Sequence, residues 1–411
     1  MPVEFPDQSP VITEHPMTSL ERRAVSSLGL LYSFRMLGLF MVLPLLAVYA
    51  ADLPGADPFT IGLALGVYGL GQAVLQIPLG WLSDHVGRKP VIVGGLVVFA
   101  LGSAVAAQAD TITGVIAGRA LQGAGAIAAT IMALVADLTR EEQRTKAMAV
   151  VGMSIGLSFA VALVLGPLVA AAGGLSTVFW FTALLAGGGI VIVLALIPTP
   201  GATRQHEDVG TRRGLIGRSL RDAGLMRLNF AVFALHFILM ALFLVVPLQL
   251  LEVGGLPRDS HWQVYLPALA LSIAGMVPMM ILAERHGRLH GMFLLGILLL
   301  MIAIVVMLTT AVSRALYLGL LLFFIGFNYL EATLPSLVSK VVFPGGKGTA
   351  LGVYATCQFL GAFAGGLVGG WLLKSVGSGG LLACCLVLGS LWLALFLPGG
   401  AVASVPAASA E

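Results

Sequence analysis

The sequence GWLSDHVGRKP, residues Gly80 to Pro90, is a short polar stretch between two long apolar segments. The segment before it covers residues 59–83, and the one after it covers residues 91–109. The stretch itself contains four charged or titratable side chains, Asp84, His85, Arg88 and Lys89. Because about 20 consecutive apolar residues are enough for a helix to cross a bilayer, we predict two membrane-spanning helices joined by a charged turn.

The composition of the whole chain is that of a membrane protein. Of its 411 residues, 58% are hydrophobic and only 10% are charged, whereas soluble domains carry about 25% charged residues. The three cysteines fall within predicted spans, so neither a disulfide framework nor a metal site is expected. No phosphate-binding loop of the Walker type is present. We therefore expect neither an enzyme nor a cofactor, and no nucleic-acid partner.

Apolar segments of spanning length follow one another along the chain. They predict an all-α membrane protein with about twelve transmembrane helices in two pseudo-symmetric six-helix bundles. The predicted parts are an N-terminal segment (1–24), a first bundle (25–197), a linker (198–226), a second bundle (227–398) and a short tail (399–411). The two bundles echo each other, since Asp84, Gly87 and Arg88 recur as Glu284, Gly287 and Arg288.

Basic residues are distributed unevenly between the two ends of these spans. Most of the 22 lysines and arginines fall on the face that carries both predicted termini. The opposite face carries only Arg258, Arg314 and Lys374. Because cytoplasmic loops of membrane proteins are enriched in Lys and Arg, we predict that the N-terminal segment, the linker and the tail are all cytoplasmic.

The linker has a pattern of its own between residues 212 and 225. On a helix, its apolar and basic side chains would lie mostly on different faces, namely Leu215, Ile216 and Leu220 against Arg213, Arg218 and Arg221. A basic amphipathic helix lying on the membrane surface fits this pattern, and a loosely ordered linker fits it equally well.

Three motifs point to a known family. The spacing of Gly80, Asp84, Gly87, Arg88 and Lys89 resembles the signature loop between the second and third helices of the major facilitator superfamily. The sequence RALQGAG, which begins at Arg119 in the fourth span, resembles the arginine motif of that superfamily.

In the fifth span, Gly166-Pro167 resembles the helix-bending antiporter motif, although Ala170 and Ala171 stand where that motif usually has glycines. Over about residues 20–398 the chain is most similar to YajR-type bacterial inner-membrane transporters of the drug:proton antiporter type. The resemblance implies the major facilitator fold and a monomer that binds a small-molecule substrate and protons within the lipid bilayer.

The charged loop can be given a role from its chemistry. An arginine fork can bind two carboxylates, so Arg88 can tie Asp84 to Asp137 at the end of the fourth span. The free N–H groups at the start of the eleventh span, residues 345–348, would favour Asp84 by about 0.3–1 kcal/mol. That contact crosses between the bundles and can exist in one conformation only. The predicted switch comprises Gly80, Asp84, Gly87, Arg88, Lys89 and Asp137; the alternative is a loop whose charges only set topology.

Four ionisable residues lie inside predicted spans, where a charge costs at least about 2.5 kcal/mol: Arg35, Arg119, His236 and Glu331. We assign them to the substrate cavity and to proton coupling, because such charges must face a cavity or each other. Structural packing remains the alternative for Arg119 and His236. An arginine stays protonated, so Glu331 and His236 are the candidate proton carriers. The hypothesis for coupling is that Glu331 approaches Arg35 in one state.

Together these patterns predict a proton-coupled secondary transporter that works by alternating access around a midplane cavity. Export of small amphipathic molecules is the preferred direction, mainly because of Gly166-Pro167. Two arginines and one glutamate make the cavity positive or neutral, which argues against cationic drugs as the main cargo. The alternatives are a proton symporter or facilitator for a small metabolite and, from another class, a membrane sensor or scaffold that transports nothing.

Overall fold

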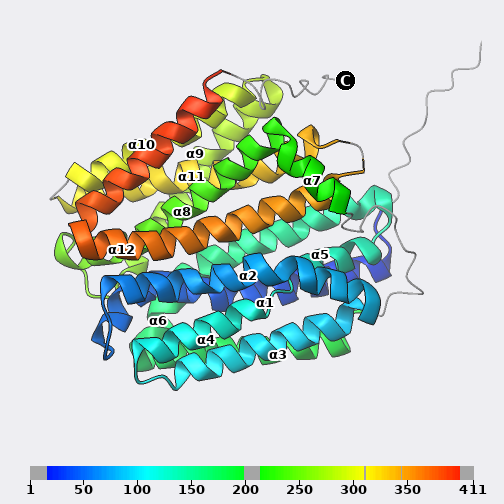
Figure 1. Cartoon of the computed structure of the whole chain (residues 1–411), viewed down its shortest axis with the longest axis horizontal. Helices are drawn as coiled ribbons and strands as arrows, with labels where there is room; N and C mark the ends of the chain where they lie inside the picture. Colours follow the sequence, from blue (N-terminus) through cyan, green and yellow to red (C-terminus); the bar gives the residue numbers. More distant parts are fainter. Residues whose placement is uncertain (1–15, 199–212, 310–311, 344, 399–411) are drawn as a thin grey trace, which may run out of the picture.

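The computed structural model describes residues 16–198, 213–309, 312–343 and 345–398, and these form helices without any β-strand. The first half consists of α1 (Ser19–Tyr49), the short η1 (Ala50–Asp52), α2 (Pro58–Val86), α3 (Arg88–Ala107), α4 (Ile112–Ala124), α5 (Ala128–Asp137) and α6 (Glu141–Ala195). The second half follows α7 (Arg213–Arg221) and consists of α8 (Ala223–Glu252), α9 (Trp262–Arg285), α10 (Leu289–Thr309), α11 (Ser313–Val341) and α12 (Lys347–Phe396). The N-terminal and C-terminal halves lie against each other along their length (Figure 1).

Two helices are too long to cross a membrane once. At about 1.5 Å per residue, the 55 residues of α6 would extend about 80 Å, against a hydrocarbon core of about 30 Å. Both α6 and the 50-residue α12 contain glycines with non-helical backbone, Gly173-Gly174 and Gly377. Gly174 has φ +70° and Gly377 φ +75°, a region that other residues rarely adopt. Among the described residues ten segments are apolar and long enough to span; with the two arms of α6 and of α12 counted separately, they agree with twelve crossings.

Several helix ends differ from the boundaries predicted from hydropathy. The first helix begins at Ser19 rather than near residue 25 because Thr18 and Glu21 cap it reciprocally: Thr18 Oγ1 accepts from the backbone N–H of Glu21 at 3.2 Å, and Glu21 Oε2 accepts from that of Thr18 at 2.8 Å. Likewise, α8 begins at Ala223 rather than at residue 227, since Asp222 caps it through the backbone N–H of Leu225 at 2.9 Å. Polar caps extend both helices beyond their apolar segments.

The linker contains a helix where it is described. In α7, Leu215 and Ile216 are partly buried while Arg218 and Arg221 are exposed. The Arg218 guanidinium lies 4.2 Å above the ring of Phe343, which follows α11. Residues 213–221 are helical, but Leu220, which was predicted on the apolar face, is exposed and Ser219 is buried, so the predicted separation of apolar and basic faces is only partly followed. Residues 199–212 of the linker, the tail from residue 399 and residues 1–15 lie outside the described part of the chain.

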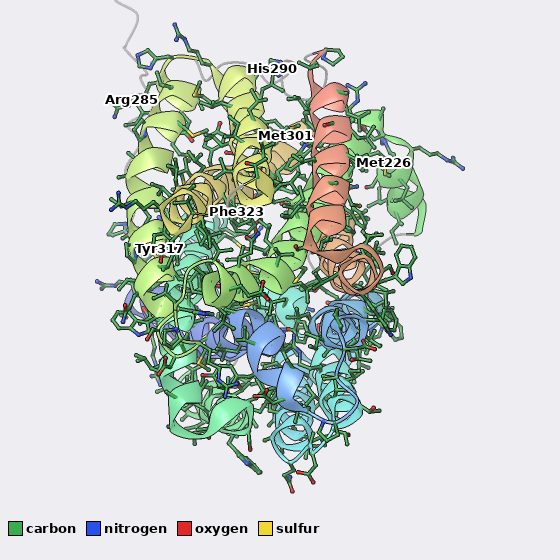
Figure 2. All side chains as sticks on the ribbon, turned by 90° about the vertical axis from the view of Figure 1, so that its left-hand side faces the viewer. Met226, Arg285, His290, Met301, Tyr317 and Phe323 are labelled. Carbon is green, nitrogen blue, oxygen red and sulfur yellow. The ribbon has the colours of Figure 1, made fainter. Side chains whose placement is uncertain are left out.

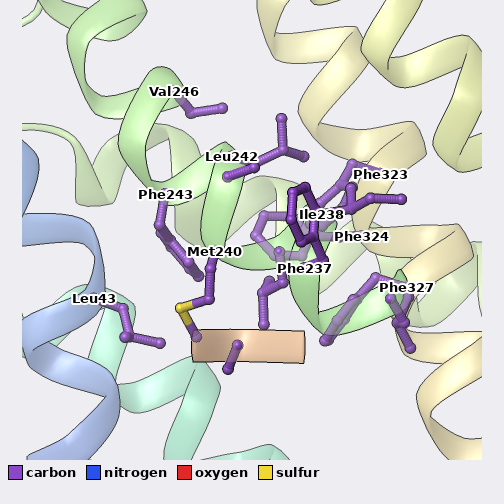
Figure 3. Packing of buried hydrophobic residues seen from close by; sticks show 14 of the residues in the cluster. Leu43, Phe237, Ile238, Met240, Leu242, Phe243, Val246, Phe323, Phe324 and Phe327 are labelled. Carbon is purple, nitrogen blue, oxygen red and sulfur yellow. The ribbon is translucent and has the colours of Figure 1, made fainter. Parts of the chain in front are cut away.

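Figure 2 looks along the molecule from the end opposite the start of α1, and it shows the C-terminal half above the N-terminal half. We call the face with the start of α1, the α2–α3 turn and α7 the N-terminal face, and the other the opposite face. Phe159 of α6 connects the two halves, because its ring lies 5.1 Å from that of Phe40 and 6.2 Å from that of Phe324. Figure 3 shows the apolar cluster in which Phe324 packs, with side chains of α8 and α11 beside Leu43 of α1.

Candidate functional site

The charged turn on the N-terminal face is a network centred on Arg88, which is 9% exposed. Arg88 Nε donates to Asp137 Oδ2 at 3.0 Å, and Nη1 donates to Ser83 Oγ at 2.7 Å and to Asp84 Oδ1. One guanidinium thus ties the end of α2 to the end of α5, as the spacing predicted. Ser83 is an additional member that its position beside Asp84 could have suggested.

Three other residues of the stretch Gly80 to Pro90 make separate contributions to its structure. Gly87 ends α2 and begins α3 with φ +95°, so the sharp turn requires a glycine. Lys89 Nζ donates to the Ile197 carbonyl oxygen at 2.6 Å, and this bond ties α3 to the residue just beyond α6. At Gly80, a Cβ atom would lie 3.9 Å from that of Ala129, which is ordinary packing between α2 and α5.

The predicted contact between Asp84 and the start of α12 is not made in this arrangement. In the described part of the chain, Arg88 is the only recorded partner of the Asp84 carboxylate, which is 34% exposed. The start of α12, from Gly346 to Gly348, lacks a side-chain cap. Formation of the contact in another conformation stays a prediction.

A buried polar network fills the N-terminal half. Arg35 and Arg119 are 1% and 0% exposed. Arg35 Nη2 donates to Tyr68 Oη at 3.1 Å and to Gln72 Oε1 at 2.9 Å. Arg119 Nε donates to the Ala64 carbonyl oxygen at 3.2 Å, and Nη1 donates to Gln122 Oε1 at 2.9 Å. Tyr68 joins the two arginines, because the Arg119 guanidinium also lies 4.9 Å from the centre of its ring.

Neither Tyr68 nor Gln72 is among the residues predicted from the sequence to form the site. They are one helical turn apart on α2, and Gln72 Nε2 also donates to the Gly123 carbonyl oxygen at 2.9 Å. Gln72 could have been identified from the sequence because it is an amide within an apolar span. The break in the helix between α4 and α5, at Gly125, was not predicted either. A Cβ atom on Gly125 would lie 2.4 Å from the Gly95 carbonyl oxygen, so the close approach of α3 accounts for the glycine.

A second polar cluster lies in the C-terminal half and joins the two predicted proton carriers. Gln358 Nε2 of α12 lies 2.8 Å from His236 Nε2 and 3.2 Å from Glu331 Oε1. His236 Nε2 is 3.7 Å from Glu331 Oε2. His236 Nδ1 lies 3.1 Å from the Val232 carbonyl oxygen. The amide of Gln358, which the sequence analysis did not identify, therefore bridges histidine and carboxylate.

This cluster changes the expected partner of Glu331. In the observed arrangement Glu331 contacts Gln358 and His236, whereas Arg35 contacts Tyr68 and Gln72. The sequence placed both Arg35 and Glu331 inside predicted spans, but a position along a helix does not specify which neighbouring helix a side chain faces. An approach of Glu331 to Arg35 in another conformation stays a prediction.

Helices α2 and α12 bring the two halves into backbone contact. A Cβ on Gly62 would lie 2.3 Å from the Gly366 carbonyl oxygen, and one on Gly69 would lie 2.7 Å from the Phe359 carbonyl oxygen. We call this line of contacts the glycine seam; it consists of Gly62, Gly66 and Gly69 on α2 and Phe359, Phe363, Gly366 and Gly370 on α12. Because Phe359 follows Gln358 and Tyr68 precedes Gly69, the seam separates the two polar clusters.

Two ion pairs cross between the halves, and both lie on the opposite face. Arg258 Nη1 is 2.7 Å from Asp52 Oδ2, and Lys374 Nζ is 2.8 Å from Asp57 Oδ2. The Lys374 hydrogen bond lowers the pKa of Asp57, and the hydrogen bond to Asp52 raises the pKa of Arg258. Together with the glycine seam, these pairs hold the halves together on that face.

A cavity of about 650 Å³ adjoins the Asp52–Arg258 pair on the opposite face, lined by Tyr49, Asp52, residues 170–176 and Arg258 among others. Within the described ranges, His, Cys, Asp and Glu side chains form no group of three that could hold a metal ion.

The predicted antiporter-like motif lies where α6 meets α1. A Cβ on Gly166 would be 3.0 Å from the Met41 carbonyl oxygen, so the glycine permits a close approach of the two helices. The helix continues through Pro167 and leaves helical geometry only at Gly173-Gly174. Gly173 and Gly174 therefore produce the reversal between the two arms of α6.

Comparisons with known proteins agree with this architecture. The sequence profile of the Major Facilitator Superfamily matches residues 28–366. The chain is 45% identical to the inner membrane transport protein YajR of Escherichia coli over 383 residues, which are 93% of this chain and 84% of that protein. It is 28% identical to the multidrug resistance protein MdtH of Aeromonas hydrophila over 362 residues, 87% of each chain.

Among solved structures, a bacterial homologue of the human lysosomal transporter Spinster, in an inward-facing and occupied conformation, superposes with a TM-score of 0.73 at 12% identity. The match covers 93% of this chain and 97% of the other. The human organic anion transporter MFSD10 superposes with a TM-score of 0.68 at 22% identity, over 92% of this chain and 100% of that one. These two likenesses concern the fold.

Proposed function

The chain belongs to the major facilitator superfamily and is a multi-pass membrane transporter, not an enzyme; we propose that it couples export of small amphipathic molecules to proton entry. We further propose that it lies in the bacterial inner membrane with the N-terminal face in the cytoplasm. The excess of Lys and Arg on that face supports this orientation, and the name of the E. coli relative supports the membrane.

The observation that carries proton coupling is the cluster of Glu331, Gln358 and His236. When His236 is neutral with its proton on Nδ1, that nitrogen donates to the Val232 carbonyl oxygen and Nε2 accepts from Gln358. The same amide nitrogen donates to Glu331 Oε1. If His236 gains a proton on Nε2, this nitrogen becomes a donor and can no longer accept from the Gln358 N–H. Its new N–H would then donate to Glu331 Oε2, which lies 3.7 Å away.

The two titratable side chains of this cluster, Glu331 and His236, differ in their exposure. The Glu331 side chain is 37% exposed while that of His236 is 10% exposed, and Glu331 Oε2 is buried without a hydrogen-bond partner among the described residues, so the carboxylate is the more accessible group of the two and keeps one oxygen free. We propose that Glu331 takes up a proton from one side of the membrane and releases it after the halves have moved. His236 and Gln358 hold the carboxylate in position and respond to its charge.

The aromatic side chains beside the cluster suit an amphipathic cargo. The ring of His236 lies 6.1 Å from that of Phe327, which in turn lies 6.4 Å from Phe159 in the other half. A ligand in this region would contact aromatic faces and a titratable group together, as in most small-molecule sites. Motion of one half would separate Phe159 from its C-terminal partners and change the shape of the region.

The test is proton flux in vesicles that contain the purified protein and a pH-sensitive dye. Anionic, neutral and cationic aromatic compounds are supplied in turn, and proton movement is recorded with and without a pH gradient. Glu331→Gln mimics the protonated carboxyl, so it should abolish uphill transport while exchange without a gradient continues. Glu252→Gln, an exposed residue at the end of α8, is the matched control.

Uphill transport by Glu331→Gln at the wild-type rate would contradict this assignment. Co-directional movement of proton and substrate would instead support a symporter. A protein that moves no compound, and no proton in response to one, would contradict transport coupling and favour a sensor or scaffold.

A further inference from the structure

The two buried arginines of the N-terminal half are not neutralised by the protein. Within the described ranges, no carboxylate lies within ion-pair distance of Arg35 or Arg119. Arg35 Nε and Nη1 and Arg119 Nη2 have no hydrogen-bond partner in the protein although they are buried. Two permanent positive charges therefore share one polar cluster in the middle of the bundle.

Neighbouring side chains hold the Arg35 guanidinium in one position. Tyr68 Oη and Gln72 Oε1 both accept from Arg35 Nη2, which fixes the guanidinium and leaves Nε and Nη1 without protein partners. Gln72 is itself held by the Gly123 carbonyl oxygen. A fixed guanidinium with free N–H groups matches the planar geometry of a carboxylate or phosphate.

One side chain of the C-terminal half packs against the apolar cluster around Tyr68. Phe359 of α12 packs against the apolar cluster that contains Tyr68, Tyr32 and Met36. Among the described members of this cluster and the residues packed against it, Phe359 is the one that comes from the C-terminal half. Its carbonyl oxygen also forms the glycine seam with Gly69. When α12 moves away from α2, the cover over Tyr68 and its partners is removed.

We propose that Arg35, with Arg119 behind Tyr68, is the subsite for a carboxylate group of the transported molecule. The inference rests on the proposed transport function and adds the substrate class, an amphipathic organic acid. The acid group would bind the free N–H groups of Arg35 after α12 has moved, and the aromatic rings near Phe159 would contact its apolar part. A purely structural role for the arginines, as ties between α1, α2 and α4, gives no preference for anions.

The experiment measures thermal unfolding of the purified full chain in detergent with three aromatic compounds of similar size. Benzoate carries the carboxylate, benzyl alcohol is neutral and benzylammonium is cationic. Benzoate should raise the midpoint of unfolding of the wild type, and by more than either of the other compounds. Sodium chloride at the same ionic strength controls for screening of charges.

Two variants connect this shift to the subsite. Arg35→Gln should lose the benzoate shift, while Arg285→Gln, an exposed arginine at the end of α9, should retain it. Gln72→Glu is the second variant, for the case that Arg35→Gln does not fold. It places a carboxylate where Gln72 Oε1 now lies 2.9 Å from Arg35 Nη2, neutralises the subsite from within and should also remove the shift.

Equal shifts with benzoate and benzyl alcohol would overturn the proposal, as would a benzoate shift that persists in Gln72→Glu or in a folded Arg35→Gln. No benzoate shift in the wild type would overturn it too. Because binding needs no gradient, the benzoate shift can be measured independently of proton coupling. A wild-type protein that shows the benzoate shift but moves no proton in response to any compound would therefore count against the proposed function alone.

Discussion

Adding one methyl group at Gly62 tests whether the glycine seam closes the opposite face. In Gly62→Ala, the new Cβ would lie 2.3 Å from the Gly366 carbonyl oxygen and 2.7 Å from the Gly370 Cα atom. Both are backbone atoms of α12, so a side-chain rotation cannot relieve the contact. The halves must separate at this point or strain the helices.

The magnitude follows from the cost of overpacking. An extra methyl group in a closely packed site costs about 1–3 kcal/mol, which corresponds to a change of about 5- to 150-fold in a population ratio. Provided that Gly62 is helical in both conformations, the higher helix propensity of alanine stabilises both and does not alter the ratio. Gly62→Ala should therefore shift the protein by that factor toward the conformation in which α2 and α12 are apart.

The assay is the distance between spin labels at Gln108 and Ser378, which are exposed on the opposite face in different halves. Both are changed to cysteine after the three native cysteines have been replaced by alanine. Gly62→Ala should move the distance distribution toward longer values. Gly94→Ala is the control, because a Cβ there meets nothing within 4 Å. If Gly62→Ala and wild type give the same distribution, the seam does not hold this face closed.

Three further outcomes are expected. Asp84→Asn and Arg88→Ala should insert and fold but transport at a small fraction of the wild-type rate, since a bias of about 2.7 kcal/mol moves equal populations to about 1:99; wild-type rates for both would refute the switch. Arg119→Lys should lower transport almost as much as Arg119→Ala, because a lysine cannot bond both the Ala64 carbonyl oxygen and Gln122 as the guanidinium does; a wild-type rate for the lysine variant would mean that charge alone suffices. Because the pKa of Asp57 is lowered, its carboxylate stays charged and paired with Lys374 above the ordinary carboxyl pKa, and the pair is lost only as the pH falls through the lowered pKa. The label distance should therefore be constant between about pH 5 and 8, and Lys374→Gln should lengthen it.

The sequence predicted those parts of the fold that depend on hydropathy, glycine and charge. The Gly173-Gly174 and Gly377 reversals divide the two longest helices into the arms that the predicted count of about twelve spans requires, and Arg88 meets both Asp84 and Asp137. Helix starts were less predictable because Thr18 and Asp222 extend α1 and α8 by polar capping. Hydropathy measures the apolar length of a helix and is insensitive to its caps.

Partners inside the bundle were much harder to predict. Depth along a helix follows from residue number, but the direction of a side chain depends on how each helix is rotated, so Arg35 was matched to Glu331 rather than to Tyr68 and Gln72. Uncharged amides such as Gln358 give only a weak signal in an apolar segment. The seam was hidden for another reason: with 52 glycines in the chain, only the distance to a facing backbone distinguishes Gly62 from Gly94.

The contacts on the opposite face differ in strength, and this orders their expected effects. Exposed ion pairs contribute about 0–1 kcal/mol, and the side chains of Asp52 and Arg258 are 70% and 44% exposed. Removing either pair should change the population ratio by at most about fivefold, whereas a methyl group in the seam should change it by up to about 150-fold. In the proposed transport cycle this face opens once in every turnover, so weak pairs suit it better than buried ones. The close fit of α2 against α12 then determines where the halves meet, and the ion pairs add a small bias toward closure.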